Sequence, residues 1–470
     1  MGDNKKTSFS ILMFPWLAHG HITPFLELAK KLAERNFVIY FCSTPINLNF
    51  IKPKLSPKHL RSICLVELQL SSEFLDLPPH YHTTNGLPPH LMSTLKKALD
   101  MAAPYFLTLL KNLTPNLLLY DFIQPWAATL ASSLNIPAVH FTTSSAATTC
   151  FFFHLVKKPY DTEWPPPITN LQDCLKFKAL EKFVRDIYIT STSNHNNDMS
   201  DMNRFTQSFE QSSFGLIFVK TFRELEGKYL DYLSLLLDKR IVPTGPLVHD
   251  DDDDDDISIK DDEYDEDGTK IIEWLNNKER SSTVFMCFGS EYFLSKEERE
   301  EIAHGLELSQ VNFIWVIRFP LGEKIELEKE LPKGFLQRTK DKGIIVEGWA
   351  PQRKILRHES IGGFVSHCGW SSVMEGLKYR VPIIAMPMHL DQPINAKVVE
   401  EVGVGLEVKR NKLNDGLDRD EIAKVIKQVV LEKMSENVRK KVKDMSDLIN
   451  KINEELIDRV VDELKSVLTI

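Results

Sequence analysis

The sequence predicts an α/β protein made of two doubly wound domains, each with a parallel sheet covered by helices on both sides. Short apolar runs alternate with amphipathic stretches in the first half of the chain, an acidic run interrupts the pattern, and the alternation then restarts. The length of 470 residues is sufficient for two or three domains. We expect an N-terminal domain, a flexible linker, a C-terminal domain and a last helix that packs back towards the N-terminal domain, over residues 1–247, 248–268, 269–450 and 451–470.

The N-terminal domain opens with a strand, a turn and a helix. The strand is expected at Phe9–Phe14, and the helix is expected to begin with Thr23 as its N-cap and Pro24 in its first turn. Apolar side chains then follow the spacing of one buried helix face. Four further strands are expected at Phe37–Cys42, Ile63–Leu68, Leu117–Tyr120 and Ala138–Thr142.

An acidic segment separates the two halves of the chain. Asp250–Asp267 holds eleven aspartates and two glutamates against one lysine, so it contributes −12 to the net charge of −9 and the remainder carries +3. Its seven consecutive aspartates, Asp250–Asp256, repel one another and cannot bury apolar surface. A calcium loop needs spaced ligands and a fixed turn, so we interpret the segment as a solvated linker without chemistry of its own.

The C-terminal domain repeats the alternation. Strands are expected at Thr283–Phe288, Phe313–Arg318, Gly343–Val346, Gly362–Val365 and Ile383–Pro387. Ser295 and Glu298 have the spacing of a capping box, which predicts a helix start there. The charged stretch from Asp418 to the C-terminus should form the closing helices. Two such domains imply a cleft between them, and ligands of parallel sheets bind at the carboxyl ends of the strands.

Composition argues against several functional classes. The near-neutral remainder of the chain offers no broad basic face, so nucleic acid is not expected as a partner. The six cysteines form no CxxC pair, which argues against a disulfide framework or a zinc ribbon and favours a reducing compartment. The apolar stretch Phe9–Phe14 is too short for a signal peptide, and no apolar run has the length of a membrane span. We expect a cytoplasmic monomer without membrane insertion.

Several common catalytic motifs are missing. The first turn between strand and helix, Pro15–His21, lacks the GxGxxG spacing of dinucleotide-binding domains. The Walker lysine motif, HExxH and the GxSxG nucleophile elbow are also absent. The chain therefore lacks the minimal parts of NAD-dependent enzymes, P-loop kinases, zinc proteases and α/β-hydrolases.

The most informative stretch is Gly362–Gly376, where a predicted strand ends near Ser366 and a helix can begin near Ser371. Backbone N–H groups at that helix start, together with His367 and the hydroxyl of Ser372, would favour a diphosphate. The same residues are also compatible with a serine N-cap and a structural histidine.

The longer segment Trp349–Gln392 has 44 residues and reads WAPQRKILRHESIGGFVSHCGWSSVMEGLKYRVPIIAMPMHLDQ. It closely resembles the signature box of plant UDP-dependent glycosyltransferases. PWLAHGH near the N-terminus, LLLYD at residues 117–121 and FGS at residues 288–290 stand where that family has them, so the resemblance spans essentially the whole chain. The resemblance implies the GT-B fold, in which two Rossmann-like domains face each other across a cleft.

The resemblance also implies that the box binds a UDP-sugar as donor substrate. Trp349 corresponds to the ring that stacks on uracil, Ala350 and Gln352 to contacts with uridine, and Glu375 to the carboxylate that accepts hydrogen bonds from the ribose. Positions at the diphosphate and the sugar are matched by Ser290, His367, Gly369, Trp370, Ser372, Asp391 and Gln392. A final glutamine is the family's usual form for glucose, so UDP-glucose is expected. Ser371 stands where the family commonly has Asn, so the donor sugar is less defined than the donor class.

A catalytic pair, His21 and Asp121, is implied by the same resemblance. An acceptor hydroxyl is a weak nucleophile at neutral pH and needs a base as it attacks the anomeric carbon. His21 follows the first strand and Asp121 follows the strand Leu117–Tyr120, so the carboxylate can fix the imidazole tautomer. The resemblance implies a single displacement with inversion, without a metal or an organic cofactor. His19 matches no family role and is interpreted as structural.

The acceptor is the least defined part of the prediction. Candidate pocket walls are Pro79–Met92, Ser144–Phe153 and Phe177–Ile189, each of which could equally be core. The sequences LPPHYHTTNGLP at 77–88, FGSEYF at 288–293 and HLDQP at 389–393 resemble a subgroup that adds glucose to the sugar of an existing glycoside. This favours a triterpenoid or flavonoid glycoside over a bare aglycone. His80 and His82 could contact the acceptor sugar or be turn residues.

Two other functional classes fit less well. A glycoside hydrolase needs two carboxylates across the scissile bond, and no such pair stands out. A non-catalytic nucleotide-sugar binding protein would keep Trp349 and Glu375 but has no use for His21 with Asp121. Release of UDP with and without an acceptor separates these classes from a transferase.

Overall fold

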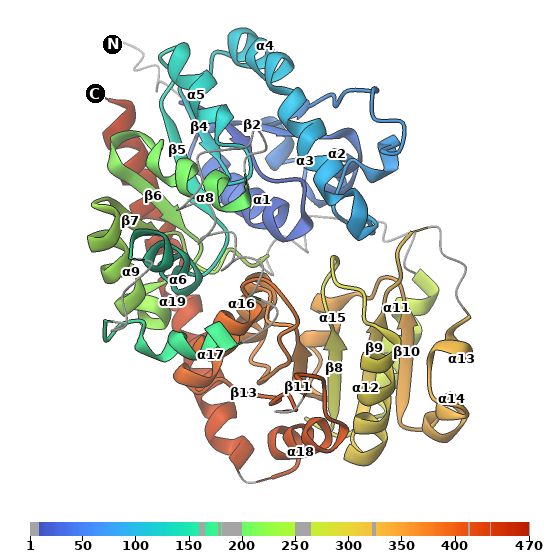
Figure 1. Ribbon diagram of the computed structural model, residues 1–470. Helices are drawn as coiled ribbons and strands as arrows, with labels where there is room; N and C mark the ends of the chain where they lie inside the picture. The colour runs from blue at the N-terminus through green and yellow to red at the C-terminus, as the bar shows by residue number, and fades with distance from the viewer. Residues whose placement is uncertain are drawn as a thin grey trace. The chain divides into compact units, whose positions relative to one another are not determined.

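The computed structural model describes residues 9–158, 165–176, 180, 200–249, 265–321, 326–411, 414–432 and 434–469. The chain divides into two compact units, one of residues 1–162, 185–259 and 452–470 and the other of residues 163–184 and 260–451 (Figure 1). The short segment 165–176 thus belongs to the second unit, although the sequence boundaries assign it to the N-terminal domain. The acidic linker from Asp250 to residue 264 and most of the candidate wall Phe177–Ile189 lie outside the described residues.

The first unit contains a sheet of seven strands in which all neighbours run parallel, in the order β3-β2-β1-β4-β5-β6-β7. The strands are β1 Ser10–Phe14, β2 Val38–Ser43, β3 Ile63–Glu67, β4 Leu117–Tyr120, β5 Ala138–Thr142, β6 Leu216–Val219 and β7 Arg240–Pro243. The first five are confirmed as predicted, whereas β6 and β7 are additional. Strand β7 lies at the edge of the sheet, and its sequence RIVP has an exposed Arg240 and a proline, so it forms only a short apolar run.

Helices cover both faces of this sheet. They are α1 His19–Ala33, α2 Pro45–Ile51, α3 Met92–Met101, α4 Ala103–Leu113, α5 Trp126–Ser133, α6 Ala146–Lys157, α8 Asp201–Glu210 and α9 Arg223–Leu237, with the C-terminal part of α19 Met434–Leu468. Short 3-10 turns lie at Lys52–Lys54, His59–Arg61, Pro79–Tyr81, Pro89–Leu91 and Ser213–Gly215.

The start of α1 differs from the prediction. Ala18 is the N-cap, and its carbonyl accepts from the N–H groups of His21 and Ile22 at 2.9 and 2.8 Å. Pro24 therefore lies inside the helix, where it removes only one hydrogen bond close to the helix end. The prediction of Thr23 as N-cap was wrong, and His21 lies in the first helical turn.

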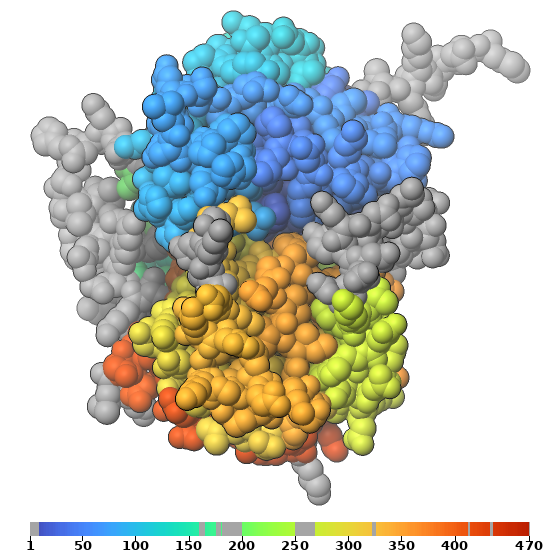
Figure 2. All heavy atoms as spheres, turned by 90° about the vertical axis from the view of Figure 1, so that its right-hand side faces the viewer, coloured from blue at the N-terminus to red at the C-terminus, as the bar shows by residue number. Residues whose placement is uncertain are grey.

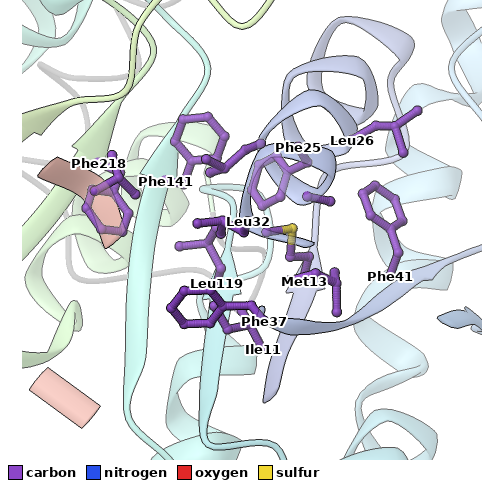
Figure 3. Close-up of a cluster of buried hydrophobic side chains, with 14 of the residues drawn as sticks. Ile11, Met13, Phe25, Leu26, Leu32, Phe37, Phe41, Leu119, Phe141 and Phe218 are labelled. Atoms are coloured by element: carbon purple, nitrogen blue, oxygen red, sulfur yellow. The ribbon is translucent and has the colours of Figure 1, made fainter. Parts of the chain in front are cut away.

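Alternation along β1 divides the core of the first unit between the two sheet faces. Ile11 and Met13 point to the face that is covered by α1 and by the end of α19, where Phe25, Leu32, Phe141 and Phe218 join them (Figure 3). Leu12 and Phe14 point to the opposite face, against α3, α4 and α5. Burial on both faces explains why these strands read as continuous apolar runs.

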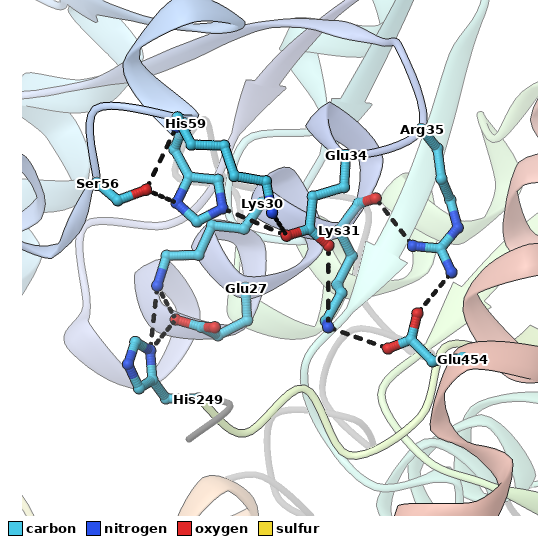
Figure 4. A network of polar contacts seen from close by, with 10 residues as sticks. Glu27, Lys30, Lys31, Glu34, Arg35, Ser56, His59, His249 and Glu454 are labelled. Carbon is cyan, nitrogen blue, oxygen red and sulfur yellow. Dashed lines mark hydrogen bonds and ion pairs between the residues drawn. The ribbon is translucent and has the colours of Figure 1, made fainter. Parts of the chain in front are cut away.

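The polar side of α1 holds two later segments of the chain (Figure 4). Lys30 Nζ lies 3.0 Å from Oε1 of Glu27 and 3.1 Å from Nδ1 of His249, the residue that directly precedes the acidic run. Burial raises the pKa of Glu27, but Lys30 and His249 lower it well below the ordinary value. The next residue of α1, Lys31, pairs with Glu454 of α19 at 3.0 Å. Helix α1 is therefore a structural anchor as well as the element that carries His21.

The second unit contains six parallel strands in the order β10-β9-β8-β11-β12-β13. They are β8 Thr283–Cys287, β9 Asn312–Ile317, β10 Gly343–Glu347, β11 Ile361–Ser366, β12 Ile383–Ala385 and β13 Gly405–Glu407. The helices are α11 Asp265–Asn276, α12 Lys296–Ser309, α13 Leu327–Glu330, α14 Phe335–Thr339, α15 Gln352–Leu356, α16 Trp370–Lys378, α17 Gln392–Val402 and α18 Arg419–Val430, with the first part of α19 and a 3-10 stretch at Thr169–Lys176. All strands except β13 were predicted.

Both faces of the second sheet are covered. Helices α12 and α18 pack on one face, and α11 and α15 pack on the other. The capping box of Ser295 and Glu298 is confirmed at the start of α12. In the space-filling view, α11 (yellow-green) and the region of α13 and α14 (gold to orange) reach the surface of this unit (Figure 2). Among the described residues, no helix combines the length and apolar character that a membrane span requires.

Candidate active site

The carboxyl edge of the first sheet brings His21 and Asp121 together. Strands β1 and β4 are neighbours with Phe14 paired to Tyr120, so the segments that follow the two strands begin side by side. Asp121 comes directly after β4, and His21 lies in the first turn of α1. Nδ1 of His21 is 2.7 Å from Oδ2 of Asp121, although the residues are 100 positions apart. The predicted pair is in direct contact.

Asp121 is a buried carboxylate with several donors. Its oxygens accept from the N–H groups of Trp16 at 3.1 Å and Phe122 at 2.8 Å, in addition to His21. Burial raises the pKa of Asp121, but the charge and hydrogen bond of His21, with the Phe122 N–H, bring that pKa below its ordinary value. An ionised carboxylate only accepts hydrogen bonds, so the shared proton sits on Nδ1 of His21 and Nε2 keeps its lone pair.

Thr143 is a third member of this cluster that was not predicted. It follows β5, the next strand in the sheet, and its Oγ1 lies 3.0 Å from Nδ1 of His21. The Phe122 ring lies 5.7 Å from the His21 ring, measured between centroids. His21 therefore sits in a fixed setting with 21% of its side chain exposed. Only the alignment of three strand ends could have identified Thr143.

The donor-box residues gather at the carboxyl edge of the second sheet. Ser290 follows β8, Trp349 follows β10, His367 follows β11, and Asp391 and Gln392 follow β12. All neighbouring strands are parallel, so these ends lie on one edge. The predicted anion and nucleotide residues are thus brought together by the sheet topology.

Trp349, Gln352 and Glu375 form the part of this edge that suits a nucleoside. The Trp349 side chain is 42% exposed, and the Arg318 guanidinium lies 4.8 Å from its ring centroid. Nε2 of Gln352 donates to Oε2 of Glu375 at 2.5 Å, and the carbonyl of the buried Ala350 accepts from the Gln352 N–H at 2.7 Å. An aromatic face linked to a carboxylate offers stacking for a base and acceptors for ribose hydroxyls. Arg318 was not predicted, because it acts only through tertiary contact.

His367 lies between two glycines. A Cβ atom at Gly369 would be 2.6 Å from Nε2 of His367, and one at Gly289 would be 2.8 Å from the same atom. Gly289 also has a φ of +76°, a conformation that favours glycine. Burial and the neighbouring His389 lower the pKa of His367 to about 3, although the Cys287 carbonyl opposes the shift. The imidazole is therefore neutral and tightly placed beside Ser290.

Replacing Gly369 by alanine should weaken UDP binding about tenfold, the equivalent of about one hydrogen bond, because the new Cβ displaces His367. The backbone at Gly369 has φ −54° and ψ 135°, which alanine adopts without strain, so the effect is steric. Calorimetric titration with UDP checks it. Gly227→Ala is the control, since a Cβ there meets its nearest atom at 4.0 Å. Unchanged UDP affinity in Gly369→Ala would refute the placement of His367 at the diphosphate.

The start of α16 carries no serine cap. Gly369 is the N-cap and makes no side-chain cap hydrogen bond, so the alternative of a serine N-cap was wrong. Ser371 and Ser372 lie in the first turn and are partly exposed. Trp370 is 4% exposed, so its indole offers little surface to a ligand.

Gln392 and Asp391 are held at the start of α17. Oε1 of Gln392 accepts from the N–H groups of Met388 and His389 at 2.9 and 3.0 Å. Its amide NH2 is therefore the group that it can offer to a ligand. Oδ2 of Asp391 accepts from Nδ2 of Asn395 at 2.8 Å.

Comparison with known proteins decides the family. The family model for UDP-glucoronosyl and UDP-glucosyl transferase matches residues 105–448. Mogroside IIIx synthase of Siraitia grosvenorii is 50% identical over 473 residues, which cover 100% of both chains. The chain belongs to this family of UDP-dependent glycosyltransferases.

Other relatives of the glycosyltransferase act on glycosides according to their names. Beta-D-glucosyl crocetin beta-1,6-glucosyltransferase of Gardenia jasminoides is 48% identical, over 97% of this chain and 98% of its own. Flavanone 7-O-glucoside 2''-O-beta-L-rhamnosyltransferase of Citrus maxima is 46% identical, over 97% and 96%. A solved Glycyrrhiza uralensis glycosyltransferase, complexed with glycyrrhetinic acid 3-O-monoglucuronide, has a TM-score of 0.81 at 23% identity, over 98% and 96%. The two parallel sheets of the glycosyltransferase are those of the GT-B fold.

The candidate acceptor residues of the glycosyltransferase differ in their burial and contacts. Residues Ala146–Phe153 of α6 are all buried, so that candidate wall is mostly core. In the loop at 77–88, the Thr84 N–H donates to the Leu17 carbonyl at 2.9 Å, which braces the turn before α1. The ring nitrogen Nε2 of His82 is 3.1 Å from the Leu77 carbonyl, a structural contact. His80 is exposed, and its acceptor role stays a prediction.

Buried neutral histidines should make the glycosyltransferase sensitive to acid. Burial lowers the pKa of His140 to about 3, with Asp121 opposing and Lys239 adding to the shift. At a pH between about 3 and the ordinary histidine pKa of 6.5, His140 binds a proton in the unfolded chain but not in the folded chain. The free energy of unfolding therefore falls as the pH falls through this range. Burial likewise lowers the pKa of His389 to about 4.

We expect His140→Phe to lower the slope of unfolding free energy against pH by about 1.4 kcal/mol per pH unit between pH 6 and pH 4, one bound proton. The phenyl ring can replace imidazole beside Phe209, whose centroid lies 4.1 Å away. Urea unfolding at several pH values measures the slope, and the exposed His90→Gln is the control. Parallel slopes for wild type and His140→Phe would contradict the prediction.

Proposed function

We propose that this glycosyltransferase transfers glucose from UDP-glucose, with inversion, to a sugar hydroxyl of an existing small-molecule glycoside. The observation that carries the reaction is the 2.7 Å contact between Nδ1 of His21 and the buried Asp121. It leaves Nε2 of His21 able to take a proton from an acceptor hydroxyl. A sugar-binding protein without catalysis has no need of this arrangement.

In the proposed step, Nε2 of His21 removes the hydroxyl proton while the acceptor oxygen bonds to the anomeric carbon of glucose. The bond from that carbon to the diphosphate oxygen breaks, and UDP leaves with the electron pair. Asp121 stabilises the imidazolium that forms, because its carboxylate is buried and already bonded to Nδ1.

Donor recognition is proposed for the box residues. Trp349 would stack on uracil, Gln352 and Glu375 would bind the ribose, and Ser290, His367, Gly369 and Ser372 would hold the diphosphate. Trp370, Asp391 and Gln392 would lie at the sugar. Gln392 favours glucose through the resemblance, while the rhamnosyltransferase among the relatives is a reason to test other donors.

The acceptor proposal is supported by the names of the relatives. A glucosyl crocetin and a flavanone glucoside are the acceptors that two of those names print, so each already carries a sugar. We propose a triterpenoid or flavonoid glycoside as acceptor, with glucosylation of a bare aglycone as the second candidate. The motifs at 77–88, 288–293 and 389–393 support the same choice through their resemblance.

No metal ion enters the proposed reaction, because the positive end of the α16 helix would balance the diphosphate charge and the neutral His367 would donate a hydrogen bond to it. EDTA at millimolar concentration should therefore change the transfer rate by less than about twofold. Initial rates before and after chelation measure this. A loss of activity that added Mg²⁺ restores would contradict the assignment.

We also propose that the enzyme is a cytoplasmic monomer. All six of its cysteines are free, which suits a reducing compartment. Light scattering on the purified chain and fractionation of expressing cells test the two parts. A dimer mass or a membrane-bound fraction would contradict them.

A panel of aglycones and their matched monoglucosides, each with UDP-glucose, tests the proposed function. We expect kcat/KM at least about tenfold higher for a glucoside than for its aglycone, and a new glucose-to-sugar bond in the product by NMR. Preferred glucosylation of the aglycone would replace the first candidate by the second. Binding of UDP-glucose without transfer to any acceptor would favour the non-catalytic class.

A further inference from the structure

Two residues that have no assigned role, Tyr292 and His389, meet in the second unit. Tyr292 of FGSEYF lies between β8 and α12, and His389 of HLDQP lies between β12 and α17. Their ring centroids are 4.9 Å apart, with an angle of 33° between the planes. Segments that are far apart in the sequence are therefore parts of one packed cluster at the donor edge.

Tyr292 is tied to a rigid helix start. Its hydroxyl donates to Oε1 of Glu298 at 2.7 Å, and Oε2 of the same carboxylate accepts from the Ser295 N–H at 2.8 Å. Oγ of Ser295 in turn accepts from the Glu298 N–H at 3.2 Å, which completes the capping box of α12. Burial and the Glu298 charge raise the pKa of Tyr292, so its hydroxyl keeps the proton that it donates. The ring is thus fixed in place by α12.

His389 is tied to Gln392 by its backbone. Its N–H donates to Oε1 of Gln392 at 3.0 Å, and its carbonyl accepts from the Gln392 N–H at 3.2 Å. The Met388 N–H donates to the same Oε1 at 2.9 Å, and Arg410 holds the preceding Pro387 carbonyl at 2.8 Å. A shift of the His389 backbone, which the ring contact with Tyr292 restrains, would therefore move the Gln392 carboxamide.

We propose that Tyr292 and His389 form a clamp that fixes the Gln392 carboxamide and thereby sets the selectivity of the enzyme for glucose among UDP-hexoses. The inference rests on the proposed place of Gln392 at the donor sugar. Two N–H donors on Oε1 prevent the amide from turning over, so only its NH2 faces the ligand. A site with a fixed donor discriminates epimers by the hydroxyl that it pairs, and a mobile one does not. Tyr292 and His389 are positioning residues in this account.

The test compares the affinities of purified variants for UDP-glucose, UDP-galactose and UDP. Tyr292→Ala and His389→Ala remove the ring contact, and His389→Phe keeps an aromatic ring against Tyr292. Ser295→Ala is the matched control, because it removes only the Oγ acceptor of the helix cap and keeps both hydrogen bonds of the Glu298 carboxylate, to the Tyr292 hydroxyl and to the backbone N–H of residue 295. We expect both alanine variants to lower the ratio of UDP-glucose to UDP-galactose affinity at least fivefold, with UDP affinity within twofold of wild type. His389→Phe and Ser295→Ala should keep the wild-type ratio.

An unchanged ratio in both alanine variants would overturn the clamp. Equal loss of affinity for UDP and both UDP-sugars would also overturn it, because it would indicate a structural role alone. Thermal unfolding of each variant identifies loss of folding. Binding requires no acceptor, so this readout is separate from the transfer assay that tests the proposed function.

Discussion

Replacing His21 by alanine should lower kcat/KM for transfer by about 10³-fold, because no other group in the cluster can take the acceptor proton. Asp121 is an acceptor buried behind the imidazole, and Thr143 contacts Nδ1 rather than Nε2. UDP affinity should stay within twofold of wild type, since the proposed donor residues all belong to the second unit. Initial rates with UDP-glucose and a glycoside, together with UDP calorimetry, measure both quantities.

His19→Ala is the matched control for this variant. His19 stacks on Phe50 with centroids 3.8 Å apart, which fits the structural role expected from the sequence. We expect a change in kcat/KM of less than about tenfold. A His21→Ala enzyme that loses UDP affinity as much as activity would refute the assignment of His21 as the base.

Asp121→Asn should lower kcat/KM by about 10²-fold or more while the fold is kept. Each oxygen of Asp121 faces an N–H donor, Oδ1 that of Phe122 and Oδ2 those of Trp16 and His21. An NH2 group in either position meets a donor. If it faces His21, it forces Nδ1 to accept and moves the ring proton to Nε2, so the base is lost.

The pH-rate profile and UDP affinity of Asp121→Asn separate this effect from general damage. We expect the activity loss at every pH between 6 and 9 with unchanged UDP binding. Asp201→Asn is the control, because Asp201 pairs with Lys96 at 2.7 Å elsewhere in the first unit. Wild-type rates in Asp121→Asn would rule out the tautomer argument.

Much of the fold could be predicted because its strands are buried on both faces. Leu117–Tyr120 and Ala138–Thr142 read as short, continuous apolar runs, and the structure has strands with those bounds. The strand Gly405–Glu407 was missed because Leu406 is its one large apolar side chain, so the strand forms no apolar run of the kind that marks Ile383–Ala385. The start of α1 was misplaced because Pro24 suits a first turn, whereas the carbonyl of Ala18 begins the helix earlier.

Some features of the candidate site could also be predicted from the sequence, and others could not. Ser295 and Glu298 could be identified locally, since a capping box is set by spacing alone. His21 and Asp121 could be paired only through the family resemblance, because 100 residues separate them. Thr143, Arg318 and the contact of Tyr292 with His389 depend on which strand ends are neighbours, and no spacing in the sequence encodes that order.

The position of the proton on the His21 ring tests directly whether His21 can act as the base. Nitrogen NMR of enzyme with ¹⁵N-labelled histidine reports which ring nitrogen carries the proton when the ring is neutral. The His21 signals are assigned by comparison with His21→Ala. We expect a protonated Nδ1 and a bare Nε2, with the proton moved to Nε2 in Asp121→Asn. A wild-type ring protonated on Nε2 would contradict it, because that nitrogen could not then accept the proton of a sugar hydroxyl.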